Sequence, residues 1–118
     1  MAVRSVSVTA PNANRNGLLI AWTGLLLNDT GEPTEAVDFA DRTVQISGTF
    51  GTGGSCTLEG SNDGSSWFAL TDPQGNNITK TAAALEVIEE GPRYIRPNVT
   101  AGDGTTNLTV TLWARRGR

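Results

Sequence analysis

The segment from Cys56 to Leu70 is the part of this sequence that most restricts its fold. Its first half alternates apolar and polar residues, its second half is rich in aromatic and aliphatic residues, and Ser61-Asn62-Asp63-Gly64 joins the two. Alternation with a period of two is typical of a half-buried strand. Asn, Asp and Gly tolerate the positive φ angles that hairpin turns require. The segment therefore predicts a β-hairpin with a tight turn.

The same alternation recurs at short intervals along the rest of the chain. Besides the hairpin, strands are expected over residues 3–9, 18–26, 43–50, 82–89, 93–100 and 106–115. Gly and Pro residues separate these stretches, and none of them supports a long helix. Seven to eight short strands predict an all-β fold, and we expect one antiparallel β-sandwich, similar to a jelly roll, over residues 1–118. Within that domain, residues 1–15 are polar enough to form an N-terminal arm.

The pattern also predicts which side chains form the core. Residues 18–26 are apolar on both sides, so this strand is expected to be covered by the core on one face and by another element or subunit on the other. Trp22 and Trp67 have apolar neighbours and are expected in the core, and Cys56 is expected to be buried and unreactive. Pro97 should confine its strand to a sheet edge or to a position where the missing N–H would face solvent. The other residues predicted to fill the core are Val44, Ile46, Leu58, Leu108, Val110 and Leu112.

Charge and composition exclude several classes of partner. Twelve acidic and nine basic residues give a net charge of −3, which argues against general nucleic-acid binding. No apolar run approaches the roughly 18 residues of a membrane span. Acidic residues are concentrated between Asn28 and Asp41, a stretch that predicts a long exposed loop, and basic residues gather at Arg115, Arg116 and Arg118.

The sequence lacks the residues that most catalytic and metal sites require. It has no histidine, one cysteine and one lysine, which excludes a His-based hydrolase triad and a zinc site of His and Cys. Glu86, Glu89 and Glu90 are close in sequence, whereas a carboxylate pair for glycoside cleavage must flank the scissile bond across a cleft. A calcium loop starting at Glu59 would need an acidic residue where Leu70 stands. No catalytic residue, metal or cofactor is therefore expected, and the protein is expected not to be an enzyme.

The segment from Arg42 to Arg116 resembles a family of small virion proteins of tailed bacteriophages. The order and spacing of several short motifs carry the likeness, over nearly two-thirds of the chain. The motifs are Thr43-Val44-Gln45-Ile46-Ser47-Gly48-Thr49-Phe50-Gly51, Leu58-Glu59-Gly60-Ser61-Asn62-Asp63-Gly64, Trp67 with Leu70, Ile95-Arg96-Pro97, Gly102-Asp103-Gly104-Thr105-Thr106, Leu108-Thr109-Val110 and Arg115-Arg116. The resemblance implies a capsid decoration or cement protein that is made in the host bacterial cytoplasm and binds the major capsid protein on the virion surface. It implies no residue-level binding site.

Two other functions stay open at this point. Ser61-Asn62-Asp63-Gly64 followed by Ser65-Ser66-Trp67 is similar to a motif of galactose-binding-like β-sandwich modules, which implies a carbohydrate-binding module, free or in a head or tail fibre. Sugar binding would need exposed aromatic side chains, for which Trp113, Tyr94 and Trp67 are the candidates. A neck or tail component of the virion would fit the same sequence.

Four residues are candidates for contact with a partner. Trp113 is expected on the outer face of its strand, next to Arg115 and Arg116, and Trp and Arg are enriched at interface hot spots. The N-terminal arm and the C-terminal arginines would contact the capsid or a neighbouring subunit, with each Arg seating a carboxylate. A small β domain without disulfides and with a two-sided apolar strand is also expected to form a homodimer or homotrimer. The predicted interface residues are Arg4, Trp113, Arg115 and Arg116.

Overall fold

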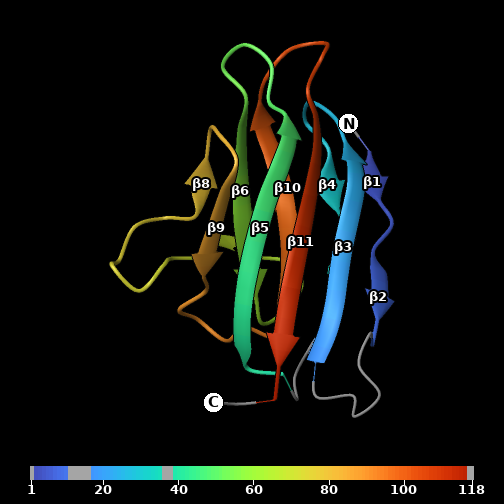
Figure 1. Cartoon of the computed structure of the whole chain (residues 1–118). Helices are drawn as coiled ribbons and strands as arrows, with labels where there is room; N and C mark the ends of the chain where they lie inside the picture. Colours follow the sequence, from blue (N-terminus) through green and yellow to red (C-terminus); the bar gives the residue numbers. More distant parts are fainter. Residues whose placement is uncertain (1, 11–16, 36–38, 117–118) are drawn as a thin grey trace.

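The computed structural model describes residues 2–10, 17–35 and 39–116, and within them the chain forms two β-sheets packed face to face (Figure 1). The six-stranded sheet has the order β1 (Val3–Arg4), β4 (Thr30–Gly31), β10 (Tyr94–Ala101), β6 (Ser55–Ser61) and β7 (Phe68–Ala69), with β8 (Thr79–Lys80) also paired to β6. The five-stranded sheet has the order β2 (Ser7–Thr9), β3 (Gly17–Leu25), β11 (Asn107–Arg115), β5 (Asp41–Thr49) and β9 (Ala84–Val87).

The predicted antiparallel β-sandwich is confirmed. All pairings between the named strands are antiparallel except the short one between β1 and β4. The described residues form eleven strands instead of seven to eight, because four of the strands are only two residues long and leave no alternation to read. No helix that could span a membrane occurs in the part of the chain that the structure describes.

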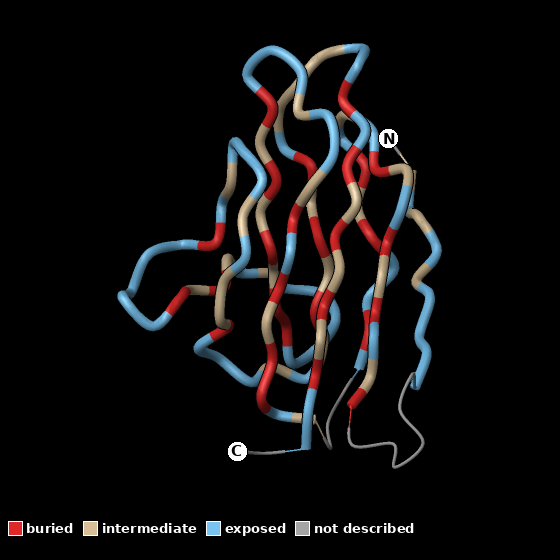
Figure 2. Tube along the Cα trace, in the orientation of Figure 1, coloured by how far each residue is buried: buried red, intermediate tan, exposed pale blue. Residues whose placement is uncertain are grey.

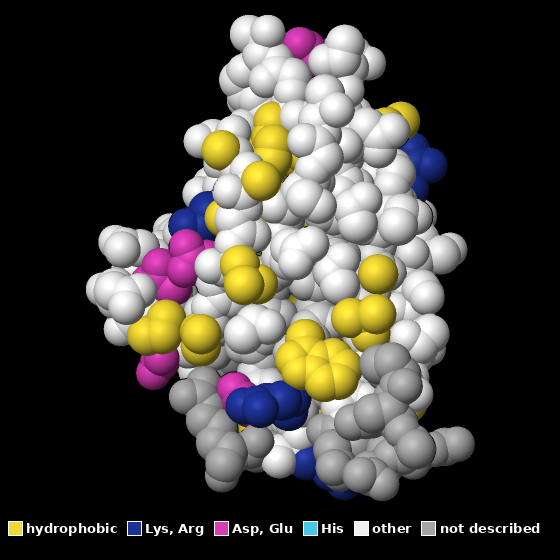
Figure 3. Space-filling view, viewed as in Figure 1, with side chains coloured by type: hydrophobic (Ala, Val, Ile, Leu, Met, Phe, Trp, Pro, Cys, Tyr) yellow, Lys and Arg dark blue, Asp and Glu magenta, His cyan; other side chains and the backbone are white. Residues whose placement is uncertain are grey.

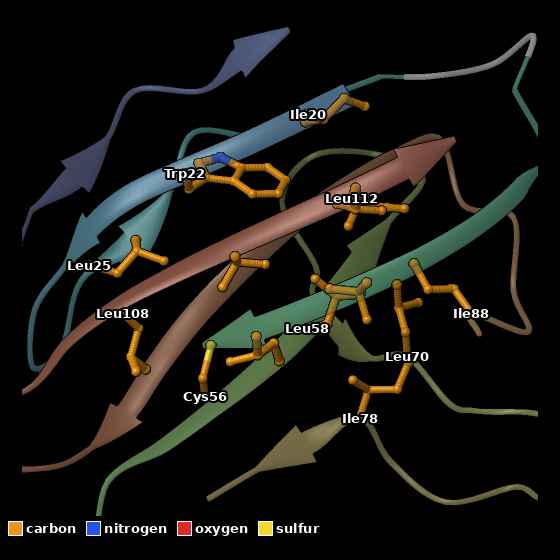
Figure 4. Packing of buried hydrophobic residues seen from close by; sticks show 14 of the residues in the cluster. Ile20, Trp22, Leu25, Cys56, Leu58, Leu70, Ile78, Ile88, Leu108 and Leu112 are labelled. Atoms are coloured by element: carbon orange, nitrogen blue, oxygen red, sulfur yellow. The ribbon is translucent and has the colours of Figure 1, made fainter. Parts of the chain in front are cut away.

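The core fills the space between the two sheets, and buried and exposed positions alternate along the long strands (Figure 2). All six residues predicted to fill it are at most 1% exposed, and Trp22 is fully buried. Cys56 also lies in this cluster (Figure 4), where burial raises the pKa of its thiol to about 12. The thiol therefore stays protonated at neutral pH, as the sequence predicted.

The first predicted strand is split between the two sheets. β1 pairs with β4 in the six-stranded sheet, and β2 pairs with β3 in the five-stranded sheet. The chain crosses from one sheet to the other between Arg4 and Ser7, and Val6 packs against the core at the crossing. A single strand over residues 3–9 is therefore wrong. The described part of the expected N-terminal arm lies in the sandwich, and residues 11–15 lie outside the described residues.

The prediction that Pro97 confines its strand to an edge is also wrong, because β10 lies between β4 and β6. Ile95 and Val99, on either side of Pro97, donate backbone hydrogen bonds to the segment 29–34. Between these bonds, Gly31 approaches so closely that a β-carbon on it would lie 2.5 Å from Cδ of Pro97 and 2.6 Å from the Trp22 ring. Pro97 has no N–H to donate to the segment 29–34, and the absence of a side chain at Gly31 leaves room for its ring there.

The expected exposed acidic loop is wrong at both of its ends, since Asp29 and Asp41 are 3% and 8% exposed. The Asp29 carboxylate accepts hydrogen bonds from the backbone N–H of Ala2 (3.0 Å) and of Leu26 (2.9 Å), and from Nε of Arg4 (2.6 Å). Burial alone would raise the pKa of Asp29, but the bonds from Leu26, Arg4 and Ala2 outweigh it and hold that pKa below its usual value. The middle of the stretch, residues 36–38, lies outside the described residues.

Candidate functional site

The outer face of the five-stranded sheet carries two complete rows of uncharged side chains. Cross-strand partners share a face, and the odd-numbered residues of β11 point away from the core that Val110 and Leu112 fill. One row across the strands is Thr9, Leu19, Trp113, Thr43 and Val87; the next is Ser7, Ala21, Thr111, Gln45 and Leu85. We call these ten residues the uncharged face.

This surface is open to solvent. Leu85 is 66% exposed and Leu19 is 37% exposed, and Gln45 is also exposed. In the space-filling view, white and yellow side chains cover the middle of the face, and basic and acidic side chains lie toward its margins and lower end (Figure 3). The second apolar side of the strand predicted over residues 18–26 therefore faces outward here, and the described elements of the chain leave Leu19 partly in solvent.

Trp113 lies where the sequence predicted, on the outside of the sheet next to Leu19. Its ring packs over the neighbouring strand, because a β-carbon on Gly17 would lie only 2.4 Å from Cη2 of Trp113. The absence of a side chain at Gly17 leaves room for the indole over the backbone there, and Trp113 is half-buried. An indole fixed in this way presents a broad apolar surface with little conformational entropy to lose on binding.

The three arginines of the predicted interface are engaged within the chain. Arg4 is paired with Asp29, as described above, and Arg115 donates from Nε to Oδ2 of Asp41 (3.1 Å) and from Nη2 to the same oxygen. The guanidinium of Arg116 lies 4.8 Å from the centre of the Phe39 ring. For Arg4 and Arg115, the carboxylates that were expected from a partner are thus supplied within the chain by Asp29 and Asp41.

The outer face of the six-stranded sheet is built from charged and aromatic side chains. Glu59 accepts hydrogen bonds from Nε of Arg96 (3.0 Å) and from Nδ2 of Asn98 (3.2 Å). The Arg96 guanidinium also lies 4.1 Å from the centre of the Trp67 ring, a cation–π distance. Trp67 is therefore half-buried under an arginine on the surface, and its predicted place in the core is wrong.

The predicted hairpin is confirmed, although its connection is wider than a tight turn. β6 and β7 pair at Glu59 with Ala69 and at Gly60 with Phe68, and residues 62–67 link them. Oδ1 of Asp63 holds this loop by accepting bonds from the Ser61 hydroxyl (2.9 Å) and from the backbone N–H of Ser65 (2.8 Å) and Ser66 (2.9 Å). Asp63 therefore has a structural role in this loop, because its carboxylate fixes the shape of the connection.

The three glutamates considered as catalytic carboxylates, Glu86, Glu89 and Glu90, are either paired within the chain or exposed to solvent. Glu86 forms an ion pair with Lys80 (2.6 Å), which joins β9 to β8 of the opposite sheet. Glu90 accepts a bond from the backbone N–H of Thr71 (2.8 Å) and another from the Thr71 hydroxyl, and Glu89 is exposed. Across the described residues, no group of three or more acidic, Cys or His side chains is arranged to hold a metal ion.

Comparison with known proteins identifies the fold. No protein-family model matches the sequence, and no curated protein matches it. The structure of SPBc2 prophage-derived protein YomS is similar, with a TM-score of 0.61 and 16% sequence identity, over 83% of this chain and 93% of that one. Peruvianin-I, a cysteine peptidase from Thevetia peruviana latex, matches with a TM-score of 0.48 and 14% identity, over 94% of this chain and 61% of that one. KdgF from Halomonas sp. matches with a TM-score of 0.44 and 11% identity, over 95% and 78%.

Among these three structures, the prophage-derived protein is the one that describes a shared fold. The chain is a two-sheet β-sandwich with one uncharged outer face and one charged outer face, and its fold is that of a protein encoded by a prophage. Two exposed apolar side chains that bear on function were missed from the sequence: Phe68, which the hairpin pattern predicts to be half-buried, and Leu85. Both lie on short strands that form a sheet edge, where alternation does not report exposure.

Proposed function

We propose that the protein is a non-enzymatic virion structural protein that binds the outside of a bacteriophage capsid and stabilises it. The observation that carries the proposal is the uncharged face, a solvent-exposed sheet surface with a half-buried tryptophan on its central strand. The resemblance to small virion proteins and the fold shared with a prophage-derived protein both support it. The partner would be the major capsid protein, at sites repeated over the particle surface.

Attachment through the uncharged face fits the geometry better than attachment through the arginines. Arg4 and Arg115 would have to give up Asp29 and Asp41, and removing one partner of a buried ion pair leaves a desolvated charge. Trp113 and Leu19 would lose only water. Binding through the uncharged face should therefore change little between low and high salt, since screening acts on charges.

One substitution tests the contact without touching the core. Gln45 is an exposed residue of the uncharged face, and Gln45→Arg would bury an unpaired charge in the interface. The affinity for particles stripped of this protein should fall by at least about tenfold, since such a charge costs several kcal/mol. Gln74→Arg is the matched control, because Gln74 is an exposed residue of a distant loop.

Equal binding of Gln45→Arg and the wild type, with Gln74→Arg also unchanged, would rule out this face as the contact.

Copy number in purified particles, measured by mass spectrometry, separates a capsid location from a neck or tail location. Hundreds of copies support a capsid protein, and about six or twelve would place the protein in the neck or tail instead. Release of reducing sugar from capsule or cell-wall polysaccharide, lost in Glu86→Gln or Glu89→Gln, would contradict the absence of enzymatic activity.

Self-association is part of the proposal, as a homodimer or homotrimer. It rests on the strand β3, which is apolar on both sides and leaves Leu19 exposed on the uncharged face. Light scattering on the free protein should show a species larger than the monomer. A stable monomer at concentrations where the protein still binds particles would remove this part of the proposal.

A carbohydrate-binding module is less well supported by the arrangement of the aromatic residues. Trp67 is covered on one side by Arg96, and the Tyr94 ring lies 4.8 Å from the guanidinium of Arg93. Trp113 lies on the outer face of a sheet, whereas sugar sites are usually concave with polar groups that converge on the ligand. None of these three residues lines the cavity described next.

A further inference from the structure

A cavity of about 530 Å³ opens beside the hairpin, away from the uncharged face. It lies between the end of β6, the edge strand β7 and the segment 90–92 that leads into β10. Its volume falls within the range of pockets that bind small ligands or single side chains. Gly60 and Gly91 line it together with Pro92, so backbone forms much of its wall.

The charge of the cavity is negative. Asp63 and Glu90 are its ionisable lining residues, and no Lys or Arg is among them. Hydrogen bonds from the backbone N–H groups of Ser66 and Ser65 and from the Ser61 hydroxyl lower the pKa of Asp63 to about 2. Burial would raise the pKa of Glu90, but the two bonds from Thr71 outweigh it and lower that pKa. Both carboxylates are therefore ionised at neutral pH.

The carboxylate of Asp63 retains acceptor capacity for a ligand. The loop uses one oxygen of Asp63, Oδ1, for the bonds to Ser61, Ser65 and Ser66. A carboxylate offers about four lone-pair sites, so further donors can be accommodated.

An exposed aromatic ring completes the cavity. Phe68 lies on the edge strand β7 and is 70% exposed, although its register partner Gly60 faces the core. An aromatic face beside two carboxylates attracts a cation through the ring quadrupole and through charge. The nearest arginines in sequence have partners of their own, because Arg93 is paired with Glu35 (2.8 Å) and Arg96 with Glu59 (3.0 Å).

We propose that this cavity binds a basic side chain, Lys or Arg, from a partner polypeptide. The apolar stem of that side chain lies against Phe68 and Pro92, and its cationic end lies between Asp63 and Glu90. Two negative charges and no positive one favour a cation over a neutral sugar. The site is independent of the uncharged face, so it provides a second contact whose strength depends on salt.

Titration with the blocked tripeptide acetyl-Gly-Lys-Gly-amide, followed by NMR chemical shifts, tests the proposal on the full chain. Shifts are expected at the backbone amides of Ser66 and Gly91, and the affinity should weaken with added salt. The same peptide with its lysine side chain acetylated should give no shifts, because acetylation removes the charge.

Two variants locate the site. Phe68→Ala should weaken binding by about two- to fivefold, the effect of losing a partly exposed cation–π contact. Glu90→Gln should weaken it as well by removing one of the two negative charges. Leu85→Ala is the matched control, since Leu85 is another exposed apolar residue on a short strand.

Circular dichroism would verify that each variant is folded. Equal binding of the charged and the acetylated peptide, no binding of either, or unchanged affinity in both Phe68→Ala and Glu90→Gln would each overturn the proposal. Binding of a neutral disaccharide in place of the charged peptide would do so too. Failure of the Gln45→Arg experiment on particles would leave this site unaffected, so the two results are distinguishable.

Discussion

The two outer faces of the sandwich are built from opposite kinds of side chain. On the six-stranded sheet, Glu59 is bonded to Arg96 and Asn98, and Arg96 also contacts Trp67. On the five-stranded sheet, two full rows carry hydroxyl, amide, aliphatic and indole groups. The first face has already used its charges within the chain, and covering it would mean desolvating them. The second face has little to lose on being covered, and for this reason we assign attachment to it.

The contrast between the two faces depends on the register of β11, which places Val110 inside the sandwich and Thr111 outside it. Substitutions at these two adjacent residues test that register. Val110 is fully buried, so Val110→Asp would place an unpaired charge in the core and should lower the free energy of unfolding by more than about 4 kcal/mol. Thr111→Asp, one residue along on the uncharged face, should cost about 1 kcal/mol or less. Urea unfolding measures both. Similar losses for the two variants would show that the register of β11 is misassigned.

The charged face should contribute more to stability than the uncharged one. Glu59→Ala removes two hydrogen bonds from a side chain that is 15% exposed, and we expect a loss of about 2 kcal/mol. Gln45→Ala on the opposite face should change stability by less than about 0.5 kcal/mol. A double-mutant cycle with Arg96→Ala should give a coupling of about 1 kcal/mol. A coupling near zero would mean that the Glu59 network is only a weak surface pair.

The smallest effect is expected at the edge of the uncharged face. Leu85 is 66% exposed, so Leu85→Glu should leave the melting temperature nearly unchanged, with a stability change within about 0.5 kcal/mol. The same variant should still reduce particle binding, because it adds a charge to the proposed contact. A large loss of stability would indicate that Leu85 is covered in the free protein, for example by a second copy.

The sequence was sufficient for the parts of the fold that depend on local pattern. Alternation identified the core positions of the long strands, from Val44 to Leu112, because burial there repeats every second residue. It failed for the charged residues, since Asp29 is buried by Arg4 and Asp41 by Arg115, partners that are 25 and 74 residues away. An acidic stretch of sequence on its own predicts exposure, and it gives no information about ion pairs with residues so far away along the chain.

The candidate surfaces were only partly predictable for a related reason. The outward position of Trp113 followed from alternation, but the row of residues beside it comes from four different strands and depends on register. The cavity at Phe68 also depends on which strand forms the sheet edge. Sheet order is set by long-range pairing, which local sequence does not contain.

The split of the first strand affects how the molecule avoids aggregation. β1 and β2 are edge strands of the two different sheets, and with five residues in all they form one edge of each sheet. Short edge strands offer few free N–H and C=O groups to another chain. Without them, the nine-residue β3 would become an edge, with unpaired backbone groups along much of its length. Deleting the first ten residues would therefore promote strand pairing between copies, and a loss of particle binding in such a truncation would reflect aggregation as much as any lost contact.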